Sequence, residues 1–350
     1  MGGFFSYWRL VVIALGAVAL LVRPSAAWVE ESFANGGYPA WEHAAFPITN
    51  ALPWSLGDIA GLLGIALVIA RVAVYVRRRR LPAWRKVALV TVDILAVAAV
   101  YAVWFEASWG WNYDRAPIEA RTAFDSSRVT PAAVDALRRT AIERMNALAP
   151  AAHARAGEAV DLDALRASWM PVVQAAGDRW SPLVGEPKNT IADPFMAMSG
   201  TSGFLNPLTL NVQLASDLLW FERPFSLSHE WSHVAAYARE DEANYLAIVT
   251  CERSPDPAAQ YSGWLELFLY LPPLGHYAKS AFAPLVWKDF AALRERNERR
   301  INLAVAHWSW KTYNVYLKSN RIASGVQNYN EVTRLILGIP LGKNGLPKGR

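Results

Sequence analysis

Three apolar stretches, at residues 10–22, 54–76 and 87–106, dominate the first third of the chain, and polar positions become frequent only after residue 115. The second stretch is longer than the roughly 20 residues that a helix needs to cross a bilayer core, the third is close to that length and the first is shorter. The pattern predicts a membrane anchor of about three transmembrane helices in residues 1–115 and a globular domain in residues 116–350.

The first apolar stretch has a second interpretation, as a cleaved signal peptide. It ends in small residues, Pro24-Ser25-Ala26-Ala27, of the kind that signal peptidase accepts. Only Arg9 supplies a positive charge ahead of it, whereas the N-terminal region of a signal peptide is usually more basic. We therefore favour an uncleaved span, followed by a loop over residues 23–53.

Beyond residue 115 the hydrophobic period is mostly that of amphipathic helices, which predicts a mainly α domain with a small β element. Alternating, β-branched residues predict one short strand, and a polar, Pro- and Gly-rich region precedes it. Ser226 or Ser228 can cap a helix just after Pro224. The expected helices are 131–148, 162–174, 285–317 and 329–337, and the expected strand is 208–214.

The basic residues predict how the chain is oriented in the membrane. Arg77-Arg78-Arg79-Arg80, Arg85 and Lys86 fill the short loop between the second and third spans, which predicts a cytoplasmic loop and a globular domain on the periplasmic or extracellular side of a bacterial cell membrane. Removing these six charges from the formal net charge of +5 leaves −1 for the rest of the chain. The composition therefore indicates a lipid bilayer as a partner and excludes nucleic acid.

The strongest chemical signal is His229-Glu230-Trp231-Ser232-His233. Residues four apart lie on one face of a helix, so His229 and His233 can present two imidazoles to one zinc ion. Glu230 lies about 100° round the helix, close enough to take a proton from a zinc-bound water without being a ligand. The motif predicts a hydrolytic zinc site with one Zn²⁺ per chain.

A third ligand is expected within Glu240-Asp241-Glu242. We favour Glu240 over Glu242 and Asp241, with Asn244, four residues on, supporting a histidine ligand through a hydrogen bond. A straight helix would carry Glu240 roughly 10 Å beyond His233, so this assignment requires the helix to end before residue 240. The intervening residues contain neither Gly nor Pro, and the sequence therefore does not mark the turn.

The single cysteine, Cys251, rules out an intramolecular disulfide and a thiolate zinc site, and we interpret it as a small buried residue. A zinc peptidase also needs a donor to the developing oxyanion. On chemistry alone Tyr261, His276, Arg321 and Tyr329 all qualify.

Short motifs along nearly the whole chain resemble a family of uncharacterised bacterial membrane proteins, a domain of unknown function that carries HExxH. That resemblance favours Tyr261 and Arg321 as oxyanion donors. It also implies an uncleaved first helix. The chain departs from the family at Ala236, where the family commonly has Gly, which would ease the turn. The matching stretches are Leu52–Asp58, Trp109–Arg115, Gly203–Pro207, Tyr261–Gly263, Ser319–Arg321 and Ser324–Val326.

The Glu240-x-x-Ala243-Asn244 arrangement is similar to the second signature of the gluzincin peptidases, which implies a zincin-like domain with Glu240 as third ligand and Asn244 in support. The expected function is a membrane-anchored zinc metallopeptidase acting on a peptide or protein substrate. Two alternatives remain. One is a non-catalytic, metal-stabilised membrane scaffold, and the other is a zinc hydrolase of a non-peptide envelope amide or lipid.

Overall fold

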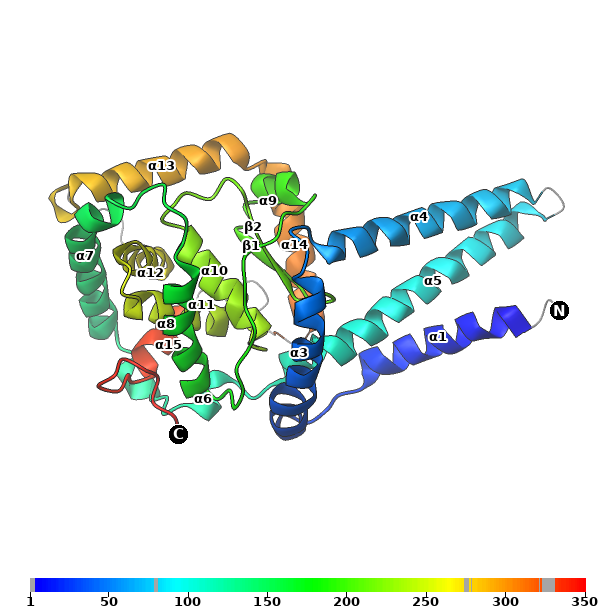
Figure 1. Ribbon diagram of the computed structural model, residues 1–350, viewed down its shortest axis with the longest axis horizontal. Helices are drawn as coiled ribbons and strands as arrows, with labels where there is room; N and C mark the ends of the chain where they lie inside the picture. The colour runs from blue at the N-terminus through cyan, green and yellow to red at the C-terminus, as the bar shows by residue number, and fades with distance from the viewer. Residues whose placement is uncertain (1–3, 79–80, 274–276, 278, 321, 323–330) are drawn as a thin grey trace.

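The computed structural model describes residues 4–78, 81–273, 277, 279–320, 322 and 331–350. The chain is mainly helical, and its long apolar helices project from a globular body (Figure 1). Two of them, α4 and α5, are long and apolar enough to cross a membrane. A third span is counted if residues 7–21 and 26–49, which are bent by 101° at a short break, form one. The N-terminal elements are α1 (Phe4–Leu21), α2 (Ala26–Trp28), the π-helix η1 (Val29–Gly37), α3 (Tyr38–Thr49), α4 (Leu56–Arg77) and α5 (Ala83–Ser108).

The expected loop over residues 23–53 is wrong, because residues 26–49 are helical and pack onto the body. Val29, Phe33 and Tyr38 are buried in the same apolar core as Trp169 and Trp231. A partly buried charge joins the apolar helices, since Asp93 of α5 pairs with Arg9 of α1 and Arg71 of α4, each at 3.0 Å.

The body contains one small antiparallel sheet, in which β1 (Gly203–Asn206) pairs with β2 (Asn211–Leu214) in the register Gly203 opposite Leu214. Sequence predicted β2 within 208–214 but missed β1. The remaining elements are η2 (Gly110–Asp114), α6 (Ile118–Arg121), η3 (Ser126–Arg128), α7 (Pro131–His153), α8 (Leu162–Ala175), α9 (Asp193–Ser199), α10 (Arg223–Val234), α11 (Glu240–Arg253), α12 (Pro257–Tyr270), η4 (Lys279–Ala281), α13 (Pro284–Arg300), α14 (Leu303–Ser319) and α15 (Val332–Gly338).

The single helix expected over 285–317 is instead two helices, α13 and α14, which run in different directions (Figure 1). Asn302 causes the break, because its side chain accepts hydrogen bonds from the backbone N–H groups of Ala304 and Val305 and so caps the start of α14. The backbone N–H of Asn302 is in turn fixed by the carbonyl of Met198 in α9, at 2.9 Å. The break turns α14 across the junction between the body and the apolar helices (Figure 1).

Candidate metal centre

The histidine motif lies on α10, a helix buried from Pro224 to Val234 although many of its residues are polar. Pro224 occupies the first turn, where its missing N–H costs nothing, and neither Ser226 nor Ser228 caps the helix as expected. Both serines lie inside it, and the Ser228 hydroxyl donates to the carbonyl of Pro224 at 2.9 Å. The first turn of α10 is thus set by proline, and the two histidines follow on one face.

α10 ends at Val234, as a ligand role for Glu240 requires, and the turn depends on Ala236. Ala236 adopts a φ of 68°, a left-handed conformation in which glycine is favoured. The Tyr237 N–H then donates to the carbonyl of Ser232 at 3.1 Å, which closes the end of the helix. The chain reverses within a few residues and enters α11 at Glu240.

Side chains from distant segments hold the last carbonyls of α10. Trp109 Nε1 donates to the carbonyl of His233 at 3.2 Å, the Tyr38 hydroxyl donates to Val234 at 2.7 Å, and Arg115 Nη1 donates to Ala235 at 3.2 Å. Helix ends leave such carbonyls unpaired, and a cation there also suits the helix dipole. These donors supply the stop signal that residues 234–239 lack.

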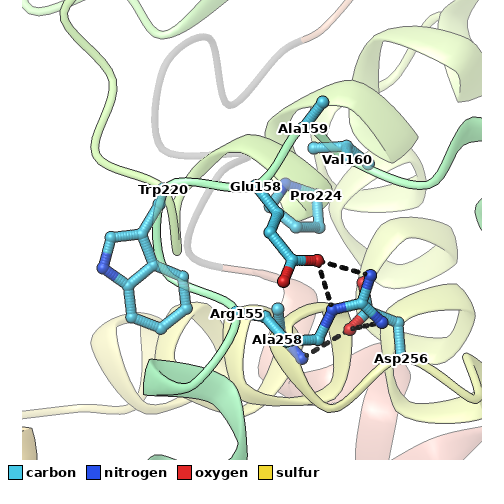
Figure 2. A pocket seen from close by; sticks show the side chains of 8 residues that line it. All are labelled: Arg155, Glu158, Ala159, Val160, Trp220, Pro224, Asp256 and Ala258. Carbon is cyan, nitrogen blue, oxygen red and sulfur yellow. Dashed lines mark hydrogen bonds and ion pairs between the residues drawn. The ribbon is translucent and has the colours of Figure 1, made fainter.

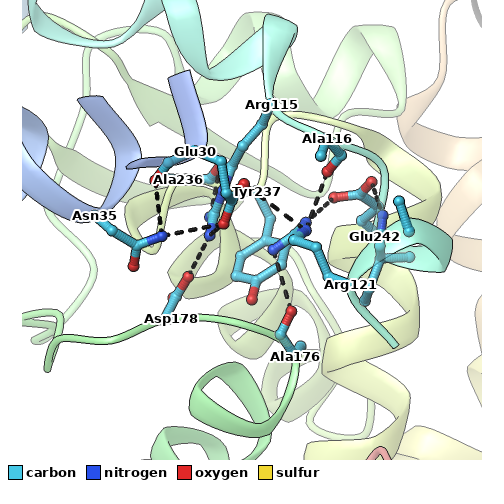
Figure 3. A network of polar contacts seen from close by, with 12 residues as sticks. Glu30, Asn35, Arg115, Ala116, Arg121, Ala176, Asp178, Ala236, Tyr237 and Glu242 are labelled. Atoms are coloured by element: carbon cyan, nitrogen blue, oxygen red, sulfur yellow. Dashed lines mark hydrogen bonds and ion pairs between the residues drawn. The ribbon is translucent and has the colours of Figure 1, made fainter. Parts of the chain in front are cut away.

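Arg115 is itself fixed in a buried network (Figure 3). Its guanidinium pairs with Glu30 at 3.0 Å and with Asp178 at 2.8 Å, and it lies over the ring of Tyr237. Burial raises the pKa of Asp178 to about 6, although Arg115 opposes the shift. Arg121 covers the other side of the network, where it pairs with Glu242. The turn after α10 is therefore held by ion pairs and by the cation–π contact between Arg115 and Tyr237.

Three ligand-type atoms converge where α10 meets α11. His229 Nε2 and His233 Nε2 are 3.1 Å apart, and Glu240 Oε2 lies 3.2 Å from the first and 3.6 Å from the second. A tetrahedral ion with bonds of about 2.0–2.2 Å separates its ligand atoms by about 3.3–3.6 Å. The three separations lie in this range or within about 0.2 Å of it, so small side-chain movements would admit one zinc-sized ion. Among the described residues it is the one such group.

The other two acids of the cluster point elsewhere. Glu242 accepts hydrogen bonds from the Ile118 N–H at 2.9 Å and from Arg121 at 3.1 Å. Asp241 lies 3.6 Å from Arg239. Of the three carboxylates considered from sequence, Glu240 alone is brought to the histidines.

The histidine tautomers also suit a metal. His233 Nδ1 lies 2.7 Å from the carbonyl of Tyr237, so a proton on Nδ1 leaves Nε2 with a lone pair facing His229 and Glu240. Burial lowers the pKa of His233, but the charge of Glu240 outweighs it and raises that pKa to about 9. A bound cation would displace the Nε2 proton of the charged imidazole and would pair with Glu240 in its place.

Glu230 is buried beside His229, His233 and Glu240 and contacts β1. Its carboxylate accepts a hydrogen bond from the Leu205 N–H, and burial raises its pKa. A Cβ on Gly203 would lie 2.4 Å from Glu230 Oε1, so glycine makes the room that this side chain occupies. Among the described residues, Glu230 Oε2 has no hydrogen-bond partner. A buried carboxylate oxygen without a donor next to three ligand atoms is what a general base requires.

Sequence reasoning missed Tyr313 of α14, whose hydroxyl donates to Glu240 Oε1. The expected hydrogen bond from Asn244 to a histidine is absent from the described contacts. Asn244 Oδ1 instead accepts from the Tyr270 hydroxyl at 3.2 Å. No local pattern marks Tyr313, since it lies 73 residues from Glu240 on a helix that the sequence merged with its neighbour.

Of the two expected oxyanion donors, Arg321 lies outside the described residues, as do His276 and Tyr329. The Tyr261 hydroxyl donates to Asp289 at 2.5 Å, and its ring packs against His153 and Trp220. None of its described contacts reaches His229, His233 or Glu240. Tyr261 therefore belongs to a separate buried cluster.

A second hollow in the body is lined by Arg155, Glu158, Ala159, Val160, Trp220, Pro224, Asp256 and Ala258 (Figure 2). Arg155 already pairs there with Glu158 at 3.0 Å and with Asp256 at 3.4 Å. The Arg155 guanidinium is therefore paired within the protein.

Comparison with known proteins gives one match. No curated protein and no solved structure matches the chain. A family described as "Protein of unknown function (DUF3810)" matches residues 33–337, which include α4 and α5, the histidine motif and α14. The chain therefore belongs to the DUF3810 family.

Proposed function

We propose that the protein is a membrane-anchored, zinc-dependent metallopeptidase. The observation that carries the proposal is the convergence of His229 Nε2, His233 Nε2 and Glu240 Oε2 within 3.6 Å, with the buried carboxylate of Glu230 beside them. Two imidazoles and a carboxylate are a typical ligand set for catalytic zinc.

His229, His233 and Glu240 would hold the ion. When bound, zinc supplies a Lewis acid that polarises a carbonyl and lowers the pKa of coordinated water. Glu230 would accept and return the proton, because its raised pKa brings it closer to neutrality and Oε2 has no donor among the described residues. The Tyr237 carbonyl would orient His233, and Tyr313 would orient Glu240.

The spacing of the motifs supports a zincin-like, gluzincin-type domain. His229-Glu230-x-x-His233 is followed by Glu240 and Asn244, the order of the two gluzincin signatures. The short sheet beside α10 is consistent with that architecture, since the Leu205 N–H of β1 contacts the proposed base. The same strand could pair with the backbone of an extended peptide.

The proposed location is the bacterial cell membrane, with the body on the periplasmic or extracellular side. α4 and α5 would cross the bilayer, and the basic residues between them would remain in the cytoplasm. In the structure α1 runs alongside α5 and is tied to it by Arg9 and Asp93, which supports a retained first span over a cleaved signal peptide.

One observation favours a second candidate, a non-catalytic scaffold in which metal only stabilises the fold. The three ligand atoms join two buried helices, α10 and α11, so an ion there would cross-link the centre of the body. The buried carboxylate of Glu230 argues for the enzyme, because a purely structural ion needs no base.

Metal content and turnover test the proposal together. The full chain in detergent should bind about one zinc, and both His233→Ala and Glu240→Ala should lose it. Glu230→Gln should keep zinc and lose hydrolysis of a quenched fluorescent peptide library. Glu242→Gln is the matched control, since it changes a buried glutamate bonded to Arg121 instead.

Turnover that persists in Glu230→Gln refutes the peptidase, and zinc binding without any Glu230-dependent turnover selects the scaffold. Cleavage of an envelope amide or lipid, with no cleavage of any peptide, would reassign the substrate to the non-peptide class.

A further inference from the structure

We propose that α14 is an amphipathic helix that rests on the bilayer crossed by α4 and α5, in the leaflet nearer the body, and that the histidine site therefore lies at the membrane surface. The proposal needs the chain to span a membrane. It holds whether or not the site hydrolyses peptides.

The position of α14 is fixed by contacts with the end of α5. The Tyr316 ring lies 6.3 Å from that of Phe105, and its hydroxyl is 3.3 Å from that of Tyr113. In Figure 1, α14 lies at the base of the apolar helices and runs across them. A helix so placed lies parallel to the surface of any bilayer that α5 crosses.

The face of α14 next to this contact is apolar and exposed. Trp308 is 61 % exposed and Val315 is 63 % exposed. These two residues are seven apart, so they lie two turns apart on one side of the helix, about 100° round from Tyr316. Exposed large apolar side chains on one side of a helix favour a contact surface, and indoles favour the membrane interface.

The next row round α14 is basic. Lys311 and Lys318, also seven apart, are both exposed, and residues 303–319 contain no acidic residue. Tryptophan and aliphatic side chains beside lysines are typical of helices that lie at the headgroup level of a bilayer with anionic lipid. The charge therefore favours a lipid surface over an apolar protein partner.

The neighbouring α9 segment also exposes apolar side chains. Phe195 and Met198 of α9 are each 39 % exposed, and Ile191, just before α9, is 65 % exposed. The Ile191 N–H donates at 2.9 Å to Asp58 near the start of α4, which ties this segment to a candidate span. Apolar side chains thus extend from α14 to the first turn of a candidate span.

The opposite face of α14 carries Tyr313, which contacts Glu240, so the helix forms the wall between the bilayer and the site. The end of α5 reaches the site as well, through Trp109 and the carbonyl of His233. Trp104, 43 % exposed, is one of the last apolar residues of α5 facing outward, and the five residues from it to Trp109 rise about 7.5 Å. The site then lies within about two helical turns of the hydrocarbon.

Nitroxide accessibility in nanodiscs containing phosphatidylglycerol tests the proposal on the full chain. Spin labels are placed at Trp308→Cys and Val315→Cys, with Ala136→Cys on α7, at the far side of the body, as the control (Figure 1). Cys251 is 0 % exposed and should remain unlabelled. We expect a higher ratio of oxygen to nickel-chelate accessibility at 308 and 315 than at 136, and a drop at 315 in Lys311→Glu/Lys318→Glu.

Accessibility at 308 and 315 equal to that at 136 overturns the proposal. Dipolar broadening between labels on two chains would also overturn it, because it assigns this face to a second copy. Neither result affects zinc content or Glu230-dependent turnover, so the two proposals fail separately.

Discussion

Gly203 offers the sharpest test of the geometry around Glu230. In Gly203→Ala the new Cβ would lie 2.4 Å from Glu230 Oε1, 2.8 Å from Cγ and 2.9 Å from Cδ, whereas ordinary contacts begin at 3.4 Å. Relieving the closest contact requires a shift of about 1 Å in the carboxylate or in β1. The three atoms nearest to the new methyl group all belong to Glu230 and none to the proposed ligands His229, His233 and Glu240.

The expected cost has two parts. Overpacking a buried position costs about 1–3 kcal/mol of stability. A misplacement of about 1 Å in a catalytic group costs about 10²-fold in rate, or about 2.7 kcal/mol in the barrier. Gly203→Ala should therefore keep its zinc while losing both turnover and stability.

A double-mutant cycle isolates the clash without any need for a substrate. Glu230→Ala removes the three atoms nearest to the new methyl group, so Gly203→Ala should cost much less in that background. The measurement is the urea midpoint of the four variants in detergent, with metal content by mass spectrometry. Gly185→Ala is the control, since its Cβ would reach only one ring atom at 3.4 Å.

An equal destabilisation by Gly203→Ala with and without Glu230 would refute the contact between β1 and the proposed base. An unchanged stability in the wild-type background would refute it too. Loss of zinc in Gly203→Ala would show that β1 supports the ligands themselves and not Glu230 alone.

Three further predictions follow from single contacts. Tyr313→Phe removes the donor to Glu240 and should weaken zinc binding about 10–100-fold in a chelator competition, and unchanged affinity would contradict this. Asp178 has a pKa of about 6 in the folded protein against an ordinary 3.8. Its protonated carboxyl therefore stabilises the folded state below about pH 4, and this contribution, at most about 3 kcal/mol, is lost as the pH rises through 6. Asp178→Asn should reduce the difference in unfolding free energy between urea titrations at about pH 4 and about pH 6.5. Burial raises the pKa of the Cys251 thiol, so a maleimide should label it only after unfolding, and rapid labelling of the folded chain would show that α11 is open.

Sequence reasoning succeeded where a signal is local. Apolar length predicted α4 and α5, and the four-residue spacing predicted that His229 and His233 share a face. It also found the need for a turn before Glu240, although the reason for the turn was invisible. The donors that end α10 come from residues 38, 109 and 115, more than a hundred positions away in sequence.

The errors have a similar origin. Residues 285–317 read as one helix because Ile301 and Asn302 suit its hydrophobic period, and only the contact of Asn302 with Met198 and its cap on α14 fix the break. β1 was missed because its four residues are too few to show a clear alternation of polar and apolar positions. Its role depends on the space beside Gly203 that the Glu230 side chain occupies. Pairings between distant segments decide these features, and a single sequence does not encode them locally.

Contacts between distant segments also join the predicted anchor, residues 1–115, to the body. The division at residue 115 separates the apolar helices from the body by composition, yet the core that surrounds α10 includes Phe33, Tyr38 and Trp109 from before that position. The carbonyls of Val234 and Ala235 would remain buried and unsatisfied without their side-chain donors, at a cost of about 1–3 kcal/mol each. The turn that brings Glu240 to the histidines is thus held by residues 38, 109 and 115, all from the part of the chain that carries the apolar helices, so the proposed site and the proposed membrane placement depend on the same contacts.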